Sequence, residues 1–263
     1  MFVVSGKKIV FRALCNNFTG RIITAIYRDK IPDLRWRKFR FSTAGTGMKS
    51  WVEASIFWGF YEGAEIRFIE KYFNGDTDVL ELGASSGIVS AHIITKMKTN
   101  YRLVSVEANK HLTAVWTENT KRHNVNGIKL ELLNAAIYYH GDTVMFDISS
   151  DTTESKLAGP DNDTGTEVPA MKLGSIVSQY GLKEYSLFSD IEGAELDILL
   201  NGDEALSTCR HIFIELHDAH RGGRLYTADE LVKIIENKGF RLVDRYGNVC
   251  FFTRSALMEK NMQ

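Results

Sequence analysis

The segment DVLELGASSGIVSAHII at residues 78–94 constrains the fold of this chain more than any other part of the sequence. An apolar run ends there in a glycine-rich turn, and a helical pattern follows the turn. This order is typical of the first strand, loop and helix of a nucleotide-binding α/β sheet. The sequence therefore predicts a mostly parallel sheet with helices on both faces.

The chemistry of this turn favours a cationic cofactor. Residues 83–87 read G-x-x-x-G and lack the close G-x-G pair of dinucleotide sites, and Glu81 just before them would repel a pyrophosphate. S-adenosylmethionine carries an ammonium and a sulfonium, which a carboxylate attracts. Glu107 ends the next apolar strand, where an acid can accept hydrogen bonds from both ribose hydroxyls. We therefore predict S-adenosylmethionine as the cofactor.

The expected cofactor site is built from the ends of neighbouring strands. Asn134 and Ala135 follow the third strand, at a position from which side chains can flank an adenine. Asp190 follows a later strand of the same sheet. The predicted cofactor-binding residues are Glu81, Gly83, Ala84, Ser85, Gly87, Glu107, Ala108, Asn134, Ala135 and Asp190.

A second group of polar residues predicts the catalytic centre. The strand at 186–189 delivers Asp190 at its carboxyl end, with Glu192 close behind, and the strand IFIELHD brings out Glu215 and His217 two residues apart. Ligands of open α/β sheets lie beyond the carboxyl ends of the strands. We therefore predict that Asp190, Glu192, Glu215 and His217 are catalytic, as a proton acceptor with carboxylates that orient it.

Each of these residues also has a purely structural interpretation. Glu192 and Glu195 could simply place favourable charge in a first helical turn, and His217 could be a hydrogen-bonded histidine at a strand end. The carboxylates could also hold a divalent cation that acidifies the hydroxyl, although we assign no metal.

Length and composition predict one main domain at residues 51–263, preceded by a basic extension at residues 1–50. The 263 residues, 44% of them hydrophobic, can bury one sizeable core. Cys15, Cys209 and Cys250 are far apart and lack metal-ligand spacing, which indicates reduced thiols. No apolar run approaches the ~20 residues of a membrane span. We expect a soluble cytoplasmic protein.

The net charge of −1 hides a strong asymmetry, because residues 1–50 hold 11 Lys and Arg against two Asp, a net +9. Read as one helix, Val10, Leu14, Phe18, Ile22 and Ile26 form a single stripe with basic residues off its centre. This pattern predicts a helix that docks on an anionic partner, such as a membrane surface. Alternatively, the apolar face packs on the catalytic domain; Gly20 also weakens the prediction of a helix.

Two further segments need an interpretation. RWRKFRF at residues 35–41 interleaves basic and aromatic residues, as single-strand nucleic-acid grooves do, but an edge strand with alternating faces explains it equally well. The acidic remainder of the chain disfavours a long polyanion, so we expect no nucleic-acid partner. Residues 149–169 are polar and hold almost no apolar mass, which predicts a mobile loop or a hairpin tip.

Several of these motifs together resemble one known family. ELGASSG, VSVEAN, NAAI, SDIEGAELDIL and FIELHD are similar to motifs of the FkbM family of class I S-adenosylmethionine-dependent methyltransferases, over residues 51–240. The resemblance implies a Rossmann-like sheet of seven strands whose last strand is antiparallel. It also implies that Glu81, Gly83, Gly87 and Glu107 carry the cofactor. The family usually has Asp and Asn where this chain has Glu81 and Ser85.

The resemblance further implies methylation of hydroxyl oxygens, often on sugars of polysaccharides or glycosylated natural products. We therefore predict an O-methyltransferase that acts on a glycan or glycosylated small molecule by in-line displacement with general-base assistance. Its acceptor would be a sugar hydroxyl, for example on a lipid-linked or anionic glycan. The alternatives are a protein or nucleic-acid methyltransferase docked by residues 1–50, and a non-catalytic protein that binds the cofactor.

Overall fold

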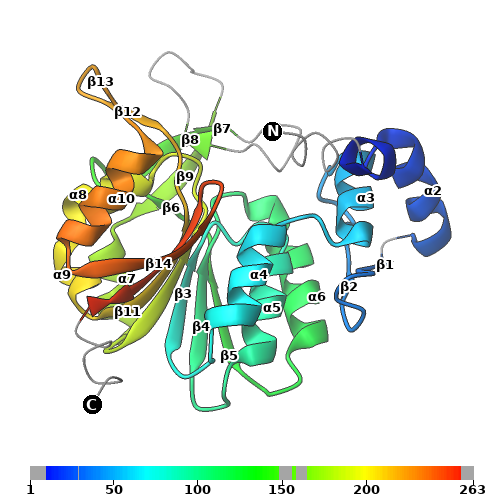
Figure 1. The fold of residues 1–263 in the computed structure, drawn as a ribbon, viewed down its shortest axis with the longest axis horizontal. Helices are drawn as coiled ribbons and strands as arrows, with labels where there is room; N and C mark the ends of the chain where they lie inside the picture. Colours follow the sequence, from blue (N-terminus) through cyan, green and yellow to red (C-terminus); the bar gives the residue numbers. More distant parts are fainter. Residues whose placement is uncertain (1–9, 29, 148–155, 158–164, 256–263) are drawn as a thin grey trace.

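The computed structural model describes residues 10–28, 30–147, 156–157 and 165–255, and its centre is a seven-stranded sheet (Figure 1). In spatial order the strands are β14 (Phe240–Tyr246), β15 (Val249–Arg254), β11 (Cys209–Glu215), β10 (Tyr185–Ser189), β3 (Asp78–Leu82), β4 (Arg102–Val106) and β5 (Lys129–Leu133). β15 runs antiparallel to both of its neighbours, whereas β11, β10, β3, β4 and β5 pair in parallel. This confirms the predicted fold class.

Helices cover both faces of the sheet. One face carries α4 (Gly63–Tyr72), α5 (Ile88–Lys96) and α6 (Thr113–His123), the last preceded by the 3-10 turn η1 (Lys110–Leu112). The other carries α7 (Leu173–Tyr180), α8 (Glu195–Asn201), α9 (Asp203–Ser207) and α10 (Ala228–Asn237). Figure 1 shows the two layers of helices with the sheet between them. Because strand side chains alternate between faces, this sheet is apolar on both sides.

Strand β3 shows how this alternation places a charge inside the protein. Val79 packs with the α4–α6 layer, while Leu80 and Leu82 pack with the opposite layer. Glu81 is therefore directed to the side of α5, where it is buried. A buried carboxylate at the end of a central strand is costly unless it has partners or a ligand.

The strand order creates a crevice at the carboxyl end of β3. The chain moves outward from β3 through β4 to β5, and returns to form β10 on the other side of β3. The loops after β3 and β10 meet at this switch point, where open α/β sheets bind their ligands. Gly83 permits the contact: a Cβ there would lie 1.8 Å from the Asp190 carbonyl oxygen, and its φ is +82°.

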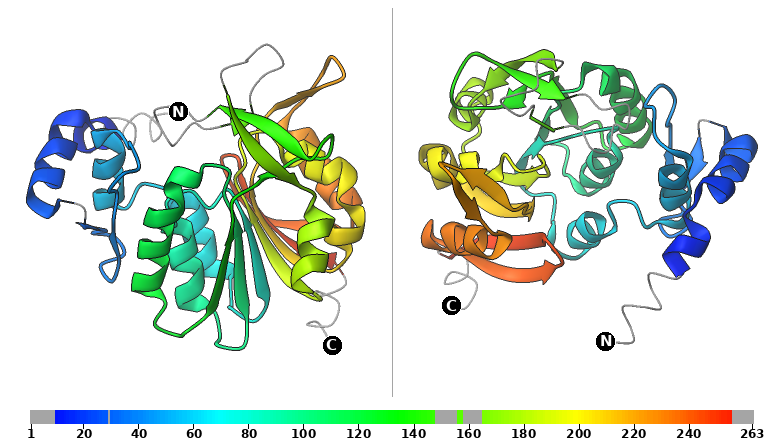
Figure 2. Two further views of the ribbon diagram at one scale, coloured as in Figure 1. Left: turned by 180° about the vertical axis from the view of Figure 1, so that it is seen from behind. Right: turned by 90° about the horizontal axis from the view of Figure 1, so that it is seen from above.

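The N-terminal residues form a separate group of elements that packs against α4 and α5. They are α2 (Asn17–Tyr27), β1 (Ile31–Pro32), β2 (Arg40–Phe41) and α3 (Ser50–Trp58). Their buried side chains, among them Ile23, Phe39 and Ile56, join Ile66 of α4 and Ile88 of α5 in one cluster. Figure 2 shows these elements at the opposite end of the molecule from α8 and α10.

The predicted N-terminal helix differs from the observed one. The helical residues 10–14 and helix α2 are separated at Asn16, whose side chain caps α2 by accepting hydrogen bonds from the N–H groups of Phe18 and Thr19. Helix α2 packs on α3 through Gly20, where a Cβ would lie 1.8 Å from the Ser50 carbonyl oxygen. Gly20 thus allows α2 to pack closely on α3.

The basic and aromatic segment at residues 35–41 is mostly a turn. Only Arg40 and Phe41 belong to a strand, so the predicted edge strand is much shorter than expected. Phe39 and Phe41 are fully buried, and the Phe39 ring stacks on the His92 ring with 3.8 Å between centroids. These two rings fill the core and present no face on which a base could stack.

In addition to the β1–β2 pair, two smaller sheets lie beyond the central one. One consists of β6 (Ala136–Ile137), β9 (Thr166–Met171), β7 (Thr143–Asp147) and β8 (Lys156–Leu157), and the other pairs β12 (Ala219–Arg221) with β13 (Arg224–Tyr226). The end of the polar segment 149–169 is thus a strand, paired with β7. Its residues 149–155 and 158–164 lie outside the described residues. Within the described residues, no helix has the length and hydropathy that a membrane span requires.

Candidate functional site

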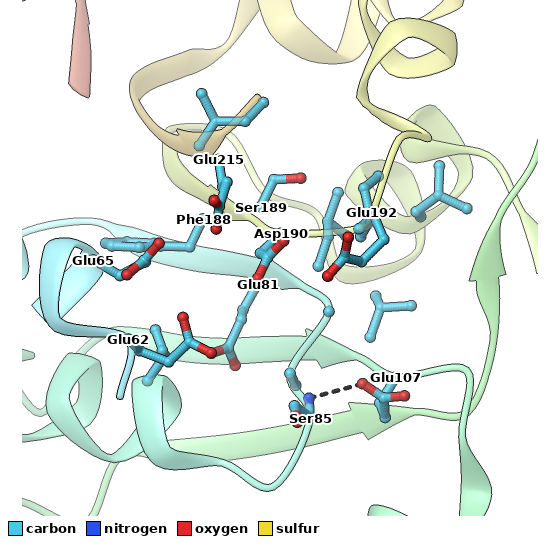
Figure 3. Close-up of a pocket in the computed structure, with 18 of the residues that line it drawn as sticks. Glu62, Glu65, Glu81, Ser85, Glu107, Phe188, Ser189, Asp190, Glu192 and Glu215 are labelled. Atoms are coloured by element: carbon cyan, nitrogen blue, oxygen red, sulfur yellow. Dashed lines mark hydrogen bonds between the residues drawn. The ribbon is translucent and has the colours of Figure 1, made fainter. Parts of the chain in front are cut away.

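A pocket opens at the carboxyl ends of β3, β4, β10 and β11 (Figure 3). It lies where strand order and the loop contact at Gly83 place the crevice. Ten of the predicted site residues line it: Glu81, Gly83, Ala84, Ser85, Glu107, Ala108, Ala135, Asp190, Glu192 and Glu215. The predicted residues Gly87, Asn134 and His217 lie outside the lining that the described residues form.

Glu107 joins two loops at the lower edge of the pocket. Its Oε2 accepts a hydrogen bond from the Ser85 N–H at 2.7 Å, and its Oε1 accepts one from the Asn109 N–H at 2.7 Å. Burial raises the pKa of the carboxyl, while these N–H groups act against the rise. Each oxygen keeps a second lone pair, so Glu107 can hold the loops and still accept bonds from a ribose.

Glu81 lies beneath the glycine-rich loop with one oxygen paired and one unpaired. Its Oε2 accepts hydrogen bonds from the hydroxyls of Ser90 at 2.6 Å and Ser105 at 2.5 Å. Its Oε1 is buried and has no hydrogen-bond partner among the described residues. Burial raises the pKa of this carboxyl to about 7. An unpaired buried acceptor that lines the pocket fits a cationic group such as the ammonium of S-adenosylmethionine.

Gly87 and Asn134 shape the loops around the pocket. Gly87 begins α5 with a φ of +80°, and a Cβ there would meet Trp116 at 3.0 Å. The Asn134 side-chain amide donates hydrogen bonds to the carbonyl oxygens of Glu107 at 2.8 Å and Ala108 at 2.9 Å. In this structure both residues therefore act on the backbone that surrounds the cofactor pocket.

Asp190 is the centre of an acidic group on the β10 and β11 side. Its Oδ1 is buried and unpaired among the described residues. Burial, followed by the charges of Glu215, Glu192 and Glu65, raises the pKa of Asp190 well above its usual range. Burial and the surrounding negative charges therefore favour the protonated form of Asp190.

His217 lies behind this group, between two glutamates. Its Nδ1 is 3.2 Å from Oε1 of Glu195, and its Nε2 is 3.5 Å from Oε2 of Glu192. Glu195 is fully buried and also accepts hydrogen bonds from the N–H groups of Ile191 and Gly193. The bond to Glu195, together with the nearby negative charges, raises the pKa of His217 to about 9. Glu195 thus holds both the loop and the imidazole.

Glu62 and Glu65 complete the acidic group, and sequence reasoning missed both. They enter the pocket from the start of α4, opposite Asp190 and Glu215 (Figure 3). Burial raises the pKa of Glu65 to about 7 and that of Glu62 well above its usual range. A signal was present: the tetrapeptide E-G-A-E occurs at 62–65 and again at 192–195. In both copies the first Glu has positive φ, +49° and +51°.

A groove leads from the acidic group toward the N-terminal elements. It shares Glu62, Glu65 and Glu215 with the first pocket, and Phe60, Arg67 and Tyr246 also line it. From the N-terminal elements it is lined by Val10, Phe11, Arg12 and Arg35. Phe60 and Tyr246 are 42% and 50% exposed, so their apolar surface is open to a ligand. The groove joins a polar, acidic end to an aromatic and basic one.

Comparison with known proteins identifies the family to which the core of this site corresponds. The family described as the methyltransferase FkbM domain matches residues 81–242. The AMB antimetabolite synthetase AmbE of Pseudomonas aeruginosa is 30% identical over 100 residues, covering 34% of this chain and 5% of AmbE. The chain therefore spans about one twentieth of that relative.

Solved methyltransferases resemble this chain at low sequence identity. Magnesium protoporphyrin IX methyltransferase from Synechocystis PCC 6803, crystallised with S-adenosylmethionine, is 9% identical with a TM-score of 0.42, over 74% of this chain and 77% of that one. A SAM-dependent methyltransferase from Aquifex aeolicus is 13% identical with a TM-score of 0.38, over 72% and 87% of the two chains.

Proposed function

Because this chain belongs to the FkbM family of S-adenosylmethionine-dependent methyltransferases, we propose that it methylates a hydroxyl oxygen of a glycan or a glycosylated small molecule. The proposed catalytic domain is residues 51–263. When bound, S-adenosylmethionine supplies a methyl group activated by positively charged sulfur. The tasks left to the protein are to orient the acceptor oxygen and to accept its proton.

The donor half of the pocket would hold the cofactor through residues of β3, β4 and β5. Glu81 offers its unpaired oxygen to the ammonium group, and Glu107 offers lone pairs to the ribose hydroxyls. Small and apolar side chains, namely Ala108, Ala135 and Ile137, line the pocket where an adenine would pack. Glu81 and Glu107 could both bind the cofactor in this way while keeping their present hydrogen bonds.

The observation that carries the proposal is the pair of His217 and Glu195 next to Asp190. A buried carboxylate that hydrogen-bonds Nδ1 fixes the imidazole and stabilises its charged form, so that Nε2, 3.5 Å from Oε2 of Glu192, would be the proton-accepting atom. Asp190 lies at the carboxyl end of β10, with a raised pKa that suits proton exchange. A proton acceptor at this position supports transfer to a hydroxyl, which must lose a proton during attack.

The surroundings of the base support a sugar as the acceptor. Glu62, Glu65 and Glu215 provide several hydrogen-bond acceptors, which suit the many donors of a sugar ring. Any of these carboxyl groups that is ionised would also repel a phosphate placed at the reacting position. The exposed rings of Phe60 and Tyr246 offer apolar surface for the C–H face of a sugar further along the groove.

Labelled methyl transfer tests this proposal. The protein would be incubated with methyl-labelled S-adenosylmethionine and a panel of nucleotide sugars, lipid-linked sugars and polysaccharide fractions. We expect label in an alkali-stable methyl ether that resists protease and nuclease. Label that is lost on protease or nuclease treatment would instead favour a protein or nucleic-acid methyltransferase. Cofactor binding without transfer to any fraction would favour the non-catalytic alternative.

Three neighbouring side chains could serve the reaction in a second way. Asp190, Glu192 and His217 each offer a ligand atom within 4.8 Å of the others. A divalent cation held there would acidify the hydroxyl directly, with no proton passing to histidine first. Activity that EDTA removes and added Mg²⁺ restores would assign this role, whereas activity that EDTA leaves unchanged would favour His217 or Asp190 as the base.

A further inference from the structure

Helix α2 leaves an apolar stripe uncovered by the rest of the protein. Phe18, Ile22 and Ile26 recur at intervals of four and therefore share one side of the helix. They are 73%, 45% and 67% exposed. The opposite side packs on α3 through Gly20 and Ile23. The alternative, in which the apolar face packs on the catalytic domain, is therefore wrong for these three residues. Phe18, Ile22, Ala25 and Ile26 are called the outward face of α2.

The charges around the outward face indicate what can cover it. Arg21 lies beside the stripe on the exposed surface of the helix, and Arg28 caps its end. The helix contains no Asp or Glu; among the described residues, Glu53 is buried on the inner side of the helix, where it accepts a hydrogen bond from Thr24. Large apolar side chains flanked by arginines are typical of helices that lie in the interface of a membrane.

We propose that the outward face of α2 docks this protein on an anionic lipid surface. The apolar side chains enter the boundary between headgroups and acyl chains, while Arg21 and Arg28 contact the anionic headgroups. Residues 1–50 carry a net charge of +9, which attracts such a surface over a longer distance. One helix of 11 residues gives weak and reversible attachment.

The groove indicates how membrane attachment would serve the proposed reaction. It runs from the acidic group to Val10, Phe11 and Arg12, which precede α2 in the chain. An acceptor sugar carried on a lipid could then lie in the groove while its lipid stays in the membrane that α2 contacts. This use rests on the proposed function, but the docking itself does not.

Vesicle binding by the full chain tests the docking without any methyl transfer. We expect the protein to sediment with vesicles of equal parts phosphatidylglycerol and phosphatidylcholine, and much less with pure phosphatidylcholine. Raising NaCl from about 0.05 M to 0.5 M should weaken binding, because the arginine contacts are screened. Equal binding to both kinds of vesicle would overturn the anionic part of the proposal.

Matched variants distinguish insertion of the outward face from nonspecific adsorption of the protein to vesicles. Phe18→Ser with Ile22→Ser should reduce binding to the anionic vesicles about tenfold or more, since both side chains lose their insertion. Leu200→Ser with Val243→Ser removes two exposed apolar side chains far from α2 and should leave binding unchanged. Circular dichroism and S-adenosylhomocysteine binding would check that each variant is folded.

Three outcomes would overturn the proposal. Wild-type binding by the Phe18→Ser, Ile22→Ser variant would show that α2 does not insert. A wild-type dimer in light scattering that this variant abolishes would assign the outward face to a second copy of the chain. A folded protein that methylates glycans yet ignores anionic vesicles would refute docking alone, whereas vesicle binding without glycan methylation would refute only the proposed function.

Discussion

The donor and acceptor halves of the pocket are built in opposite ways. On the donor side, both oxygens of Glu107 accept backbone N–H groups and one oxygen of Glu81 accepts two hydroxyls. On the acceptor side, carboxyls of Asp190 and Glu65 face one another with raised pKa values. The donor half is therefore largely fixed before ligand binding, whereas in the acceptor half burial and neighbouring carboxyl groups together disfavour ionisation, which a ligand can relieve.

The largest effect is expected from His217, because it would accept the proton. His217→Ala should lower kcat by ~10²–10⁴-fold and leave the Kd for S-adenosylhomocysteine nearly unchanged. Steady-state kinetics and calorimetry would measure the two constants. Normal kcat in this variant, with activity lost in Asp190→Asn, would move the base to Asp190.

The pH profile sharpens the same assignment. Neutral histidine is the active form of a base, and the pKa of His217 is raised to about 9. The rate should therefore rise roughly tenfold per pH unit below that pKa and level off above it. A rate that is flat between pH 7 and 9 would exclude His217 as the base.

Gly83 tests whether the two halves depend on one backbone contact. Gly83→Ala would force a methyl group into the Asp190 carbonyl oxygen and also strain a φ of +82°, so we expect a loss of more than about 3 kcal/mol in unfolding free energy. Gly181→Ala is the matched control, since its φ is +60° and its surroundings are open. It should cost only about 1 kcal/mol. Similar losses in both variants would show that strain alone matters at Gly83.

Glu107 tests the rigidity of the donor half. Glu107→Ala removes the acceptor of two loop N–H groups and the proposed partner of the ribose. Binding of S-adenosylhomocysteine should weaken by about 1.5–3 kcal/mol, the range of hydrogen bonds to charged groups. Calorimetry would measure the affinity, and an unchanged Kd in a folded variant would remove Glu107 from the cofactor site.

Glu65 tests how far burial and neighbouring carboxyl groups disfavour ionisation in the acceptor half. Its pKa is raised to about 7 in the folded protein, so the folded state binds this proton more tightly than the unfolded chain does. That stabilisation is fully present below about pH 4.5 and is lost as pH rises through 7. Glu65→Gln cannot ionise and does not lose this stabilisation. Its unfolding free energy, relative to that of the wild type, should therefore be up to about 2 kcal/mol higher at pH 8 than at pH 5. Denaturant unfolding of both proteins at both pH values would measure this difference in unfolding free energy. The same difference at pH 5 and pH 8 would contradict the prediction.

The smallest effect concerns Glu81. Its carboxyl must lose a proton to attract a cation, and its pKa is raised to about 7. Affinity for S-adenosylmethionine should therefore rise about fivefold between pH 6 and pH 7. Glu81→Gln should bind more weakly and show no such rise. An equal rise in this variant would assign the pH dependence to another group.

Local sequence determined much of the fold and the donor half. The run of apolar residues before Glu81, the turn after it, and the position of Glu107 at a strand end each lie within one short segment. Strand period, turn chemistry and strand ends are local properties, so the sequence predicted the sheet, the cofactor and the placement of both acids in the pocket. The antiparallel direction of the last strand, β15, was expected from the family resemblance.

The tertiary structure alone decided which distant segments meet. Glu65 joins Asp190 across the pocket because α4 and the loop after β10 converge there, and Glu195 reaches His217 only because α8 packs beside the end of β11. For α2, periodicity gave the stripe but not the side that packs, which the close contact of Gly20 with α3 determined. Such contacts depend on strand order and on helix packing, which many residues fix together and no short segment encodes.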